Sequence, residues 1–181
     1  MKRVTLVLVA LALVLDGVGK AEAGLTGLSV NSTYYQPLTN PVENDGTQLV
    51  APPATFTAFG FLHETVSDTQ IALSFGIDGF FASSSFSGPV FDFLGSGNRI
   101  TAVTVDNSTT VAGFNSSLVT LASDGNGGQL VEVNLQSLPF STTVNATLDV
   151  TAAAAPEPST VVLFGLGALG LFAVARRPRA A

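Results

Sequence analysis

Apolar and polar residues alternate with a period of two along much of the chain between residues 70 and 150. The alternation is clearest in 71–77, 131–136 and 144–150, where Ile, Leu, Val, Phe or Ala occupies every second position. Successive side chains of a β-strand point to opposite faces of its sheet. Each run therefore predicts a strand with one buried and one solvent-facing side.

Turn-forming residues lie between these runs and predict hairpins. The turns are Asp78-Gly79, Gly95-Ser96-Gly97-Asn98 and Asp124-Gly125-Asn126-Gly127-Gly128. The first is expected to join 71–77 to a strand at 80–86, the second to precede 100–105, and the third to precede 130–135. Further strands are expected at 55–62, 111–114 and 118–122. Residues 24–53, which are rich in Pro, Asn and Thr, are interpreted as one short strand and loops.

These runs amount to about eight to ten short strands, with no convincing amphipathic helix. Short strands separated by such turns favour an all-β fold, an antiparallel β-sandwich, over a parallel α/β sheet. A jelly-roll-like arrangement of the strands is left open. Residues 24–151 are therefore expected to form one β-sandwich domain, flanked by an N-terminal signal helix and a C-terminal transmembrane helix.

The first 23 residues have the three parts of a secretory signal. Lys2 and Arg3 form a basic start, 4–15 is an apolar run, and Ala21 and Ala23 are small residues at the spacing that signal peptidase requires. The apolar run is shorter than the about 20 residues that a permanent transmembrane helix needs. We expect residues 1–23 to be removed by cleavage after Ala23, and a retained anchor is the alternative.

The C-terminal tail, 156–181, also has three parts in a fixed order: a Pro-Glu-Pro motif, an uncharged apolar run at about 160–175 and a basic end at 176–179. The apolar run favours a single transmembrane helix, and the basic end favours a cytoplasmic C-terminus. The domain is therefore expected outside the cytoplasm, joined to the tail by an alanine spacer at 152–155. The motif residues are Pro156, Glu157 and Pro158, and the arginines are Arg176, Arg177 and Arg179.

This tail resembles the PEP-CTERM sorting signal, which is read by an exosortase, a membrane-embedded processing enzyme. The resemblance covers the tail only. It implies that the Pro-Glu-Pro residues are recognised, and that the helix and the arginines hold them at the outer membrane face. A plain single-pass anchor is the alternative. A Gram-positive wall sorting signal does not fit, because no Leu-Pro-x-Thr-Gly precedes the apolar run.

The charge and the cysteine content argue against several classes of function. Only 11% of the residues are charged, and between residues 24 and 155 Arg99 is the one basic residue against ten acids, a net charge of −9. A surface with that field would repel phosphate backbones, which argues against nucleic-acid binding. The chain has no cysteine. Disulfides, thiolate metal sites and cysteine nucleophiles are therefore excluded.

Candidate chemistry within the domain is sparse. His63, the only histidine, adjoins Glu64, but neighbours in a strand point to opposite faces and do not form a ready dyad. Glu64 and Glu132 are a conceivable carboxylate pair for glycoside cleavage. Carboxylate and amide oxygens in acidic loops suit a hard cation, and plain turns are the alternative. The weak calcium candidates are Asp124, Asn126 and Asp106.

Two more features have a functional and a plain interpretation. Asn-x-Ser/Thr sequons resemble glycosylation acceptors, although an Asn/Ser/Thr-rich composition is the simpler explanation. The sequons begin at Asn31, Asn107, Asn115 and Asn145. Most of the eleven phenylalanines of the domain are expected in its core. An aromatic ligand platform on Phe80, Phe81 or Phe86 is the alternative.

The expected function is that of an exported, non-enzymatic surface or extracellular-matrix protein, delivered and processed through its tail. Expected partners are signal peptidase, an exosortase-like enzyme and the membrane. By resemblance to PEP-CTERM proteins, exopolysaccharide is a further expected partner. No cofactor is expected, and calcium is the alternative. An extracellular polysaccharide- or calcium-binding module is the first alternative, and a glycan-active enzyme is the second.

Overall fold

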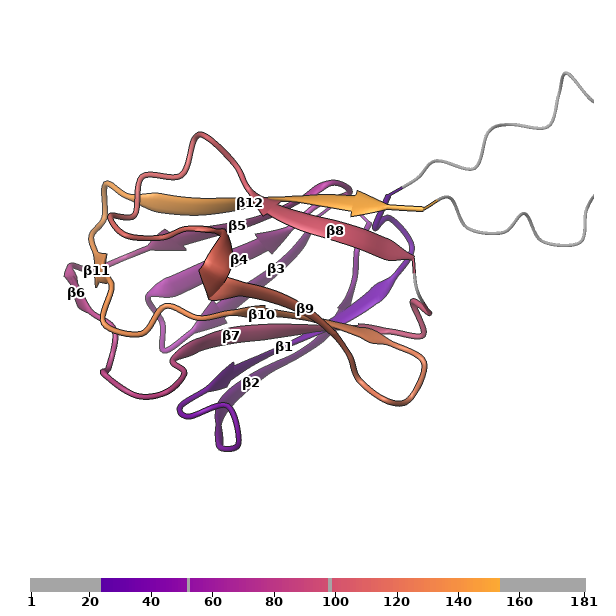
Figure 1. The fold of residues 1–181 in the computed structure, drawn as a ribbon, viewed down its shortest axis with the longest axis horizontal. Coiled ribbons are helices and arrows are strands. Elements are labelled where there is room, and N and C mark those ends of the chain that lie inside the picture. The colour runs from indigo at the N-terminus through magenta and orange to yellow at the C-terminus, as the bar shows by residue number, and fades with distance from the viewer. Residues whose placement is uncertain (1–23, 52, 98, 154–181) are drawn as a thin grey trace, which may run out of the picture. The chain divides into compact units, whose positions relative to one another are not determined.

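The computed structural model describes residues 24–51, 53–97 and 99–153, which fold as β-structure (Figure 1). They contain twelve strands and one short 3-10 helix. The elements are β1 (Ser29–Tyr35), β2 (Pro41–Leu49), β3 (Ala54–Ala58), β4 (Leu62–Val66), β5 (Gln70–Phe75), β6 (Gly79–Phe80), β7 (Gly88–Leu94), β8 (Ile100–Val105), η1 (Ser116–Leu118), β9 (Val119–Ser123), β10 (Gln129–Val133), β11 (Pro139–Phe140) and β12 (Asn145–Ala152).

Ten of the strands form two five-stranded sheets. Sheet A has the order β2-β1-β7-β10-β9, sheet B has the order β3-β4-β5-β12-β8, and the short strands β6 and β11 pair with each other. The strand pairs are antiparallel. The predicted all-β antiparallel fold is therefore confirmed, and Figure 1 shows the two sheets as separate layers.

Both sheets contribute to one hydrophobic core. The alternating residues of the sequence pattern lie in it, with Leu73 of β5, Val131 of β10 and Leu148 of β12 fully buried. β7 adds Phe91 and Phe93, which are among the largest fully buried side chains. Because the inner face of each sheet contributes to the same cluster, the arrangement is sandwich-like.

Two glutamine side chains connect the sheets near their edges. Gln129 of β10 accepts a hydrogen bond from the N–H of Ile100 at 2.7 Å and donates one to its carbonyl oxygen at 2.8 Å. Gln48 of β2 makes the same pair of bonds with Thr55 of β3, at 3.1 Å and 2.5 Å. A side-chain amide has the donor and the acceptor of a peptide group. Each glutamine side chain therefore bonds to the N–H and the C=O of one residue in the other sheet, as the backbone of a neighbouring strand would.

The N-terminal part of the domain is more regular than predicted. Residues 24–53 contain two strands, β1 and β2, rather than one short strand. β1 buries the polar residues Ser32 and Thr33, which breaks the apolar alternation of its sequence. Its backbone nevertheless pairs with β2 on one side and with β7 on the other.

Three further predicted strands differ from the structure. The strand expected at 55–62 is divided between β3 and β4, because Phe59 and Gly60 turn the chain with positive φ angles of 53° and 71°. Of the segment 80–86 only Phe80 is in a strand, and 111–114 is not a strand. The sequence pattern missed β7, because residues 88–91 are all buried and show no alternation.

Only one of the three predicted turns joins paired strands. The turn at 124–128 connects β9 to β10, as expected. Asp78-Gly79 leads instead to β6, which pairs with β11, since β4 and β12 occupy both edges of β5. The segment expected to turn at 95–98 follows β7 of sheet A and precedes β8 of sheet B, so it does not join paired strands.

The predicted signal helix at 1–23 and the predicted transmembrane helix and basic end at 160–179 lie outside the described residues. Within 24–51, 53–97 and 99–153 no helix has the length and apolarity to cross a membrane. β12 extends to Ala152, so the first residue of the expected spacer belongs to the last strand of the domain.

Candidate functional site

A shallow cleft of about 200 Å³ lies on the outer face of sheet A. Along β1, Ser32 and Tyr34 point into the core. Because side chains alternate along a strand, Asn31, Thr33 and Tyr35 point the opposite way and line the cleft. One wall of the cleft is therefore the polar side of β1, whose other side packs into the core.

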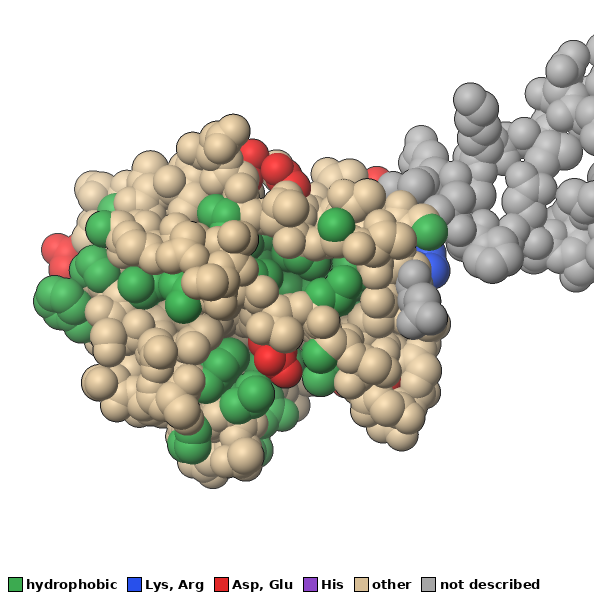
Figure 2. Space-filling model, viewed as in Figure 1, with side chains coloured by type: hydrophobic (Ala, Val, Ile, Leu, Met, Phe, Trp, Pro, Cys, Tyr) green, Lys and Arg blue, Asp and Glu red, His purple; other side chains and the backbone are tan. Residues whose placement is uncertain are grey.

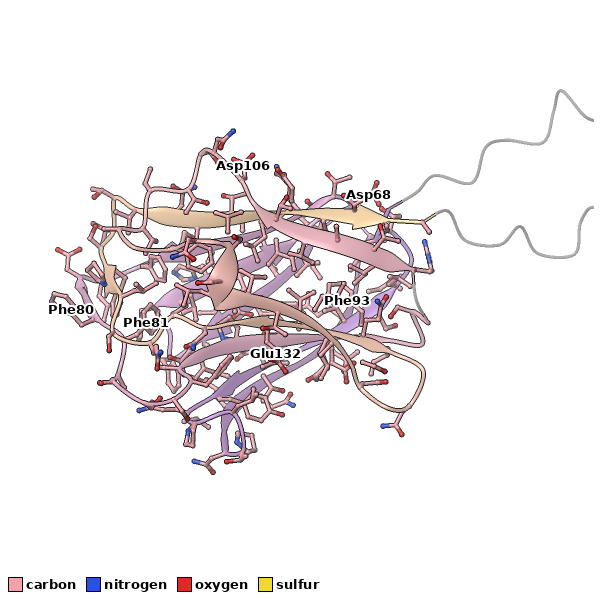
Figure 3. All side chains as sticks on the ribbon, in the orientation of Figure 1. Asp68, Phe80, Phe81, Phe93, Asp106 and Glu132 are labelled. Carbon is pink, nitrogen blue, oxygen red and sulfur yellow. The ribbon has the colours of Figure 1, made fainter. Side chains whose placement is uncertain are left out.

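Two acids from the central strands of sheet A also face the cleft. The strand register places Asp92 of β7 between Asn31 of β1 and Leu130 of β10, and it places Glu132 of β10 opposite Val90 of β7. Residues directly opposite one another in a sheet share a face. Asp92 and Glu132 are thus diagonal neighbours on one surface. Figure 3 shows Glu132 on β10, and Figure 2 shows acidic atoms beside apolar side chains in the lower middle of the same view.

The two carboxyl groups of the cleft are partly shielded from water. Burial raises the pKa of Asp92, and the nearby charge of Asp124 raises it further. Burial also raises the pKa of Glu132. The Oδ1 atom of Asp92 is buried and has no hydrogen-bond partner among the described residues. A ligand hydroxyl or a cation at this position would satisfy that acceptor.

Beside the cleft, the outer face of β1 and β2 carries a network of amide and hydroxyl groups. Asn44 donates to Thr33 Oγ1 at 2.9 Å, and Thr33 donates to Asn31 Oδ1 at 2.9 Å. Asn31 Nδ2 in turn donates to Thr47 Oγ1 at 3.2 Å and to Asn44 Oδ1 at 3.3 Å. These mutual bonds fix the side chains that form this side of the cleft.

The structure does not bring Glu64 and Glu132 together, so the carboxylate pair considered from the sequence is wrong. Glu64 lies on β4 in sheet B with only 1% of its surface exposed, whereas Glu132 faces outward from sheet A. The acid that shares the cleft with Glu132 is Asp92. Its position was detectable in the sequence, because Phe91-Asp92-Phe93 places an acid opposite two apolar neighbours.

Glu64 has a polar environment inside the core. Ser32 donates a hydrogen bond to its Oε2 atom, while Oε1 is buried and has no partner among the described residues. Burial raises the pKa of Glu64 to about 8 despite the Ser32 bond, and the charges of Asp45 and Glu43 add to the increase. The Glu64 carboxyl is therefore largely protonated at neutral pH and closed to substrates.

His63 lies on the surface, and two of the calcium candidates, Asp124 and Asp106, accept hydrogen bonds from backbone N–H groups of their own loops. His63 is exposed and faces away from Glu64, as predicted. Asp124 Oδ1 accepts bonds from the N–H groups of Asn126 and Gly128, both at 2.7 Å, within the β9–β10 turn. Asp106 Oδ1 accepts one from Ser108 N–H at 2.7 Å, and the Ser108 bonds lower the pKa of Asp106. No three acidic or histidine side chains converge in a metal-binding cluster within the described ranges.

The sequon asparagines differ in their surroundings. Asn31 belongs to the network beside the cleft, and Asn115 caps η1 by accepting from Ser117 N–H at 3.0 Å. Asn145 is partly buried and accepts from Thr110 at 2.8 Å. Asn107 is exposed in the loop after β8.

The three phenylalanines considered for a ligand platform do not share a surface. Phe81 and Phe86 are each 6% exposed, whereas Phe80 is 76% exposed. Phe81 packs against Phe140 and Phe75, with ring centroids 4.6 Å and 5.7 Å apart. Figure 3 shows Phe80 at the outer tip of the fold, with Phe81 behind it toward the core. Phe81 and Phe86 are therefore core residues, and of the three candidates only Phe80 presents its ring to solvent.

Comparison with known proteins identifies the tail. Residues 154–177 match the family described as the PEP-CTERM protein-sorting motif, which confirms the resemblance of the tail. The match includes the Pro-Glu-Pro motif and reaches Arg177. No curated protein and no solved structure matches the chain at a significant level. The tail therefore indicates an exported protein directed to an exosortase, with a membrane-anchored sorting signal at its C-terminus.

Proposed function

We propose that this chain is a non-enzymatic surface or extracellular-matrix protein whose β-domain is the delivered part. The observation that carries the proposal is the match of residues 154–177 to the PEP-CTERM sorting motif. The arrangement of the domain supports it. The last strand ends at Ala152, so the sorting motif follows directly after a folded domain. Exosortase cleaves near Pro156–Pro158 after export and releases the domain from its membrane segment to the surface.

Mass spectrometry of the exported protein tests this proposal. The expected mature C-terminus lies near residues 156–159, and substitution of Pro156 and Pro158 by Ala leaves the intact tail in the membrane fraction. Pro53→Ala is the matched control, because Pro53 is an exposed proline of the domain and outside the motif. An intact Arg179 in the mature wild-type protein would support a permanent anchor. Retention of the domain in the cytoplasm would overturn export.

A second candidate function is binding of extracellular polysaccharide in the cleft of sheet A. The lining of the cleft favours it, because the acceptor oxygens of Asp92 and Glu132 lie on the same face as the hydroxyl and ring of Tyr35. Sugar hydroxyls bind carboxylate and amide groups, and sugar rings stack on aromatic faces. The partly buried acids do not require a metal for this role. Calcium held by the same acids is the competing ligand.

A glycan array with and without calcium separates these ligands. Tyr35→Ala and Asp92→Asn are expected to lower glycan binding at least about tenfold, a loss of about 1.4 kcal/mol. Asp149→Asn on β12 of sheet B is the control. Binding that appears only with calcium would favour the cation. Glycan hydrolysis that is lost in Glu132→Gln would contradict a non-enzymatic role.

A further inference from the structure

Gly24, the first described residue, is buried where the chain enters the domain. Leu25 N–H donates to the carbonyl oxygen of Asp68 at 2.8 Å, and Thr26 N–H donates to Asp68 Oδ1 at 2.8 Å. Asp68 lies in the turn between β4 and β5, at the end of the fold where β12 also ends (Figure 3). The start of the domain is therefore fixed against one carboxylate.

Gly24 lies so close to this carboxylate that a larger residue at position 24 would require the Asp68 side chain to move. A Cβ atom on Gly24 would lie 2.1 Å from Asp68 Oδ1 and 2.4 Å from Oδ2. Since a backbone nitrogen lies about 2.5 Å from the Cβ of its own residue, the nitrogen of Gly24 lies at most about 4.6 Å from Oδ1. A positive charge on that nitrogen would be within ion-pair range after a small rotation.

Arg99 connects the start of the domain to its end. Its guanidinium group donates to the carbonyl oxygen of Gly24 at 2.9 Å, and its own carbonyl oxygen accepts from Ala153 N–H at 2.6 Å. Arg99 is also the only basic residue between residues 24 and 153. The hydrogen bonds from Thr26 lower the pKa of Asp68, and the charge of Arg99 adds a smaller decrease. Asp68 is thus held ionised beside Gly24.

We propose that removal of the secretory signal creates an ion pair between the new α-ammonium group of Gly24 and the carboxylate of Asp68. Hydrolysis of the Ala23–Gly24 peptide bond consumes one water molecule. It leaves a carboxylate on Ala23, and the proton that this new carboxyl group releases converts the amine of Gly24 into an ammonium group. Before cleavage this nitrogen is a neutral amide. Removal of the signal therefore adds a second cation beside Asp68, where Arg99 is the one basic side chain of the described residues. The new ion pair stabilises the end of the domain at which β12 also ends.

This inference rests on export and on cleavage after Ala23, but on no particular partner of the domain. The experiment uses the protein expressed from the whole sequence and isolated after export. In a second version, Gly-Ser is inserted between Ala23 and Gly24. The insertion keeps the small residues of the cleavage site and a glycine after it, and it moves the new ammonium group two residues away from Asp68. Asp68→Asn is introduced into both versions.

Urea denaturation gives the unfolding equilibrium constant of each form. Asp68→Asn is expected to raise this constant about fivefold more in the normally processed protein than in the insertion version, because only the former loses an ion pair. The amide oxygen introduced by Asp68→Asn can still accept the Thr26 bond, and any weakening of that bond is common to both versions and cancels. Asp78→Asn is the matched control, since Asp78 Oδ1 also accepts a backbone N–H, that of Thr142 at 2.9 Å. Equal effects of Asp68→Asn in the two versions would overturn the ion pair.

Two further measurements keep the outcomes distinct. The pKa of the Gly24 amine, measured by nitrogen NMR, is expected above the ordinary range of about 7.7 to 8.0 in the processed protein and inside it in Asp68→Asn. N-terminal sequencing of the exported protein is expected to begin at Gly24. A different first residue would overturn the proposal at its first step. Failure of tail processing would leave Gly24 as the first residue, so it would count against the proposed function alone.

Discussion

Glu64 is a carboxylic acid among residues of a hydrophobic core. Its partners in the neighbouring strands are Phe56 and Leu73, and Val66 on the same face of β4 is fully buried. One bond from Ser32 does not replace the hydration that the charged form would lose. The protonated form is therefore favoured, which is why burial raises the pKa of Glu64 to about 8.

We expect the stability of the domain to fall as the pH rises from the unfolded-state pKa of 4.5 to the folded-state pKa of about 8. In this window the folded state keeps a proton that the unfolded state has lost, so the contribution of Glu64 is complete only below the window. The slope from one such group is at most about 1.4 kcal/mol per pH unit. Glu64→Gln has no proton to lose and should flatten it. Urea denaturation across this pH range measures both proteins.

Asp149→Asn is the control for this prediction. Asp149 of β12 accepts a hydrogen bond from Gln70 at 2.9 Å near the surface, and its substitution should leave the pH slope intact. An unchanged slope in Glu64→Gln would assign the pH dependence to other groups with a raised pKa. Those groups are Asp45, Asp92 and Glu132.

The orientation of some side chains could be predicted from the sequence, whereas the burial of others could not. The opposite orientations of His63 and Glu64 follow from strand geometry and were predicted. The outward orientation of Asp92 follows from its two phenylalanine neighbours in the same way. The burial of Glu64 depends on β1, which is more than two dozen residues away and supplies Ser32. No local pattern contains that information.

At the scale of elements, the glutamine contacts between the sheets should matter according to their burial. Gln129 is 7% exposed and satisfies both backbone groups of Ile100. Gln129→Glu keeps an acceptor for the Ile100 N–H but directs a carboxylate at the Ile100 carbonyl oxygen. We expect a loss of about 2 to 4 kcal/mol in the free energy of unfolding. Urea denaturation measures the loss, and hydrogen exchange of the Ile100 amide reports it locally.

Gln48→Glu is the matched comparison. Gln48 makes the same two bonds with Thr55 but lies in a more exposed position on β2. Water can solvate the introduced charge there, so the expected loss is about 1 kcal/mol or less. Equal losses at the two positions, or an unchanged exchange rate of the Ile100 amide in Gln129→Glu, would contradict a role for burial.

Strands with one buried face were predictable and the others were not. β5, β10 and β12 bury every second side chain, and the corresponding runs predicted them. β7 buries the four consecutive residues 88–91 at its start, so its sequence shows no alternation there. β1 combines strand pairing with buried polar residues. In both strands, contacts with distant parts of the chain determine burial, so local periodicity fails.

At the scale of the whole molecule, the acidic excess of the domain should make its stability depend on salt. Ten acids and one arginine lie between residues 24 and 153. Their repulsion is greater in the compact state and is screened by ions. Raising NaCl from about 20 mM to about 300 mM is therefore expected to raise the urea midpoint. Calcium chloride at matched ionic strength is the comparison. A larger increase with calcium would reveal a specific site, because a ligand of the folded state adds its own binding free energy.

The sorting tail could be predicted from the sequence, whereas the cleft of sheet A could not. The destination of the protein follows from the order of motif, apolar run and arginines in the tail, which is a local pattern. The cleft of sheet A depends on the register of β1, β7 and β10, three strands that are far apart in the sequence. That register is set by the shared core, so the sequence revealed the tail and did not reveal the cleft.

The position of β12 has a mechanical consequence. β12 is an inner strand of sheet B, bonded to β5 along one edge and to β8 along the other, and it is the strand that continues into the tail. Drag on the domain while the tail is still anchored would pull along this strand. Two hydrogen-bonded ladders would then have to slide at once, whereas an edge strand would peel away one bond at a time. The domain is thus attached through a strand that is well placed to bear a load.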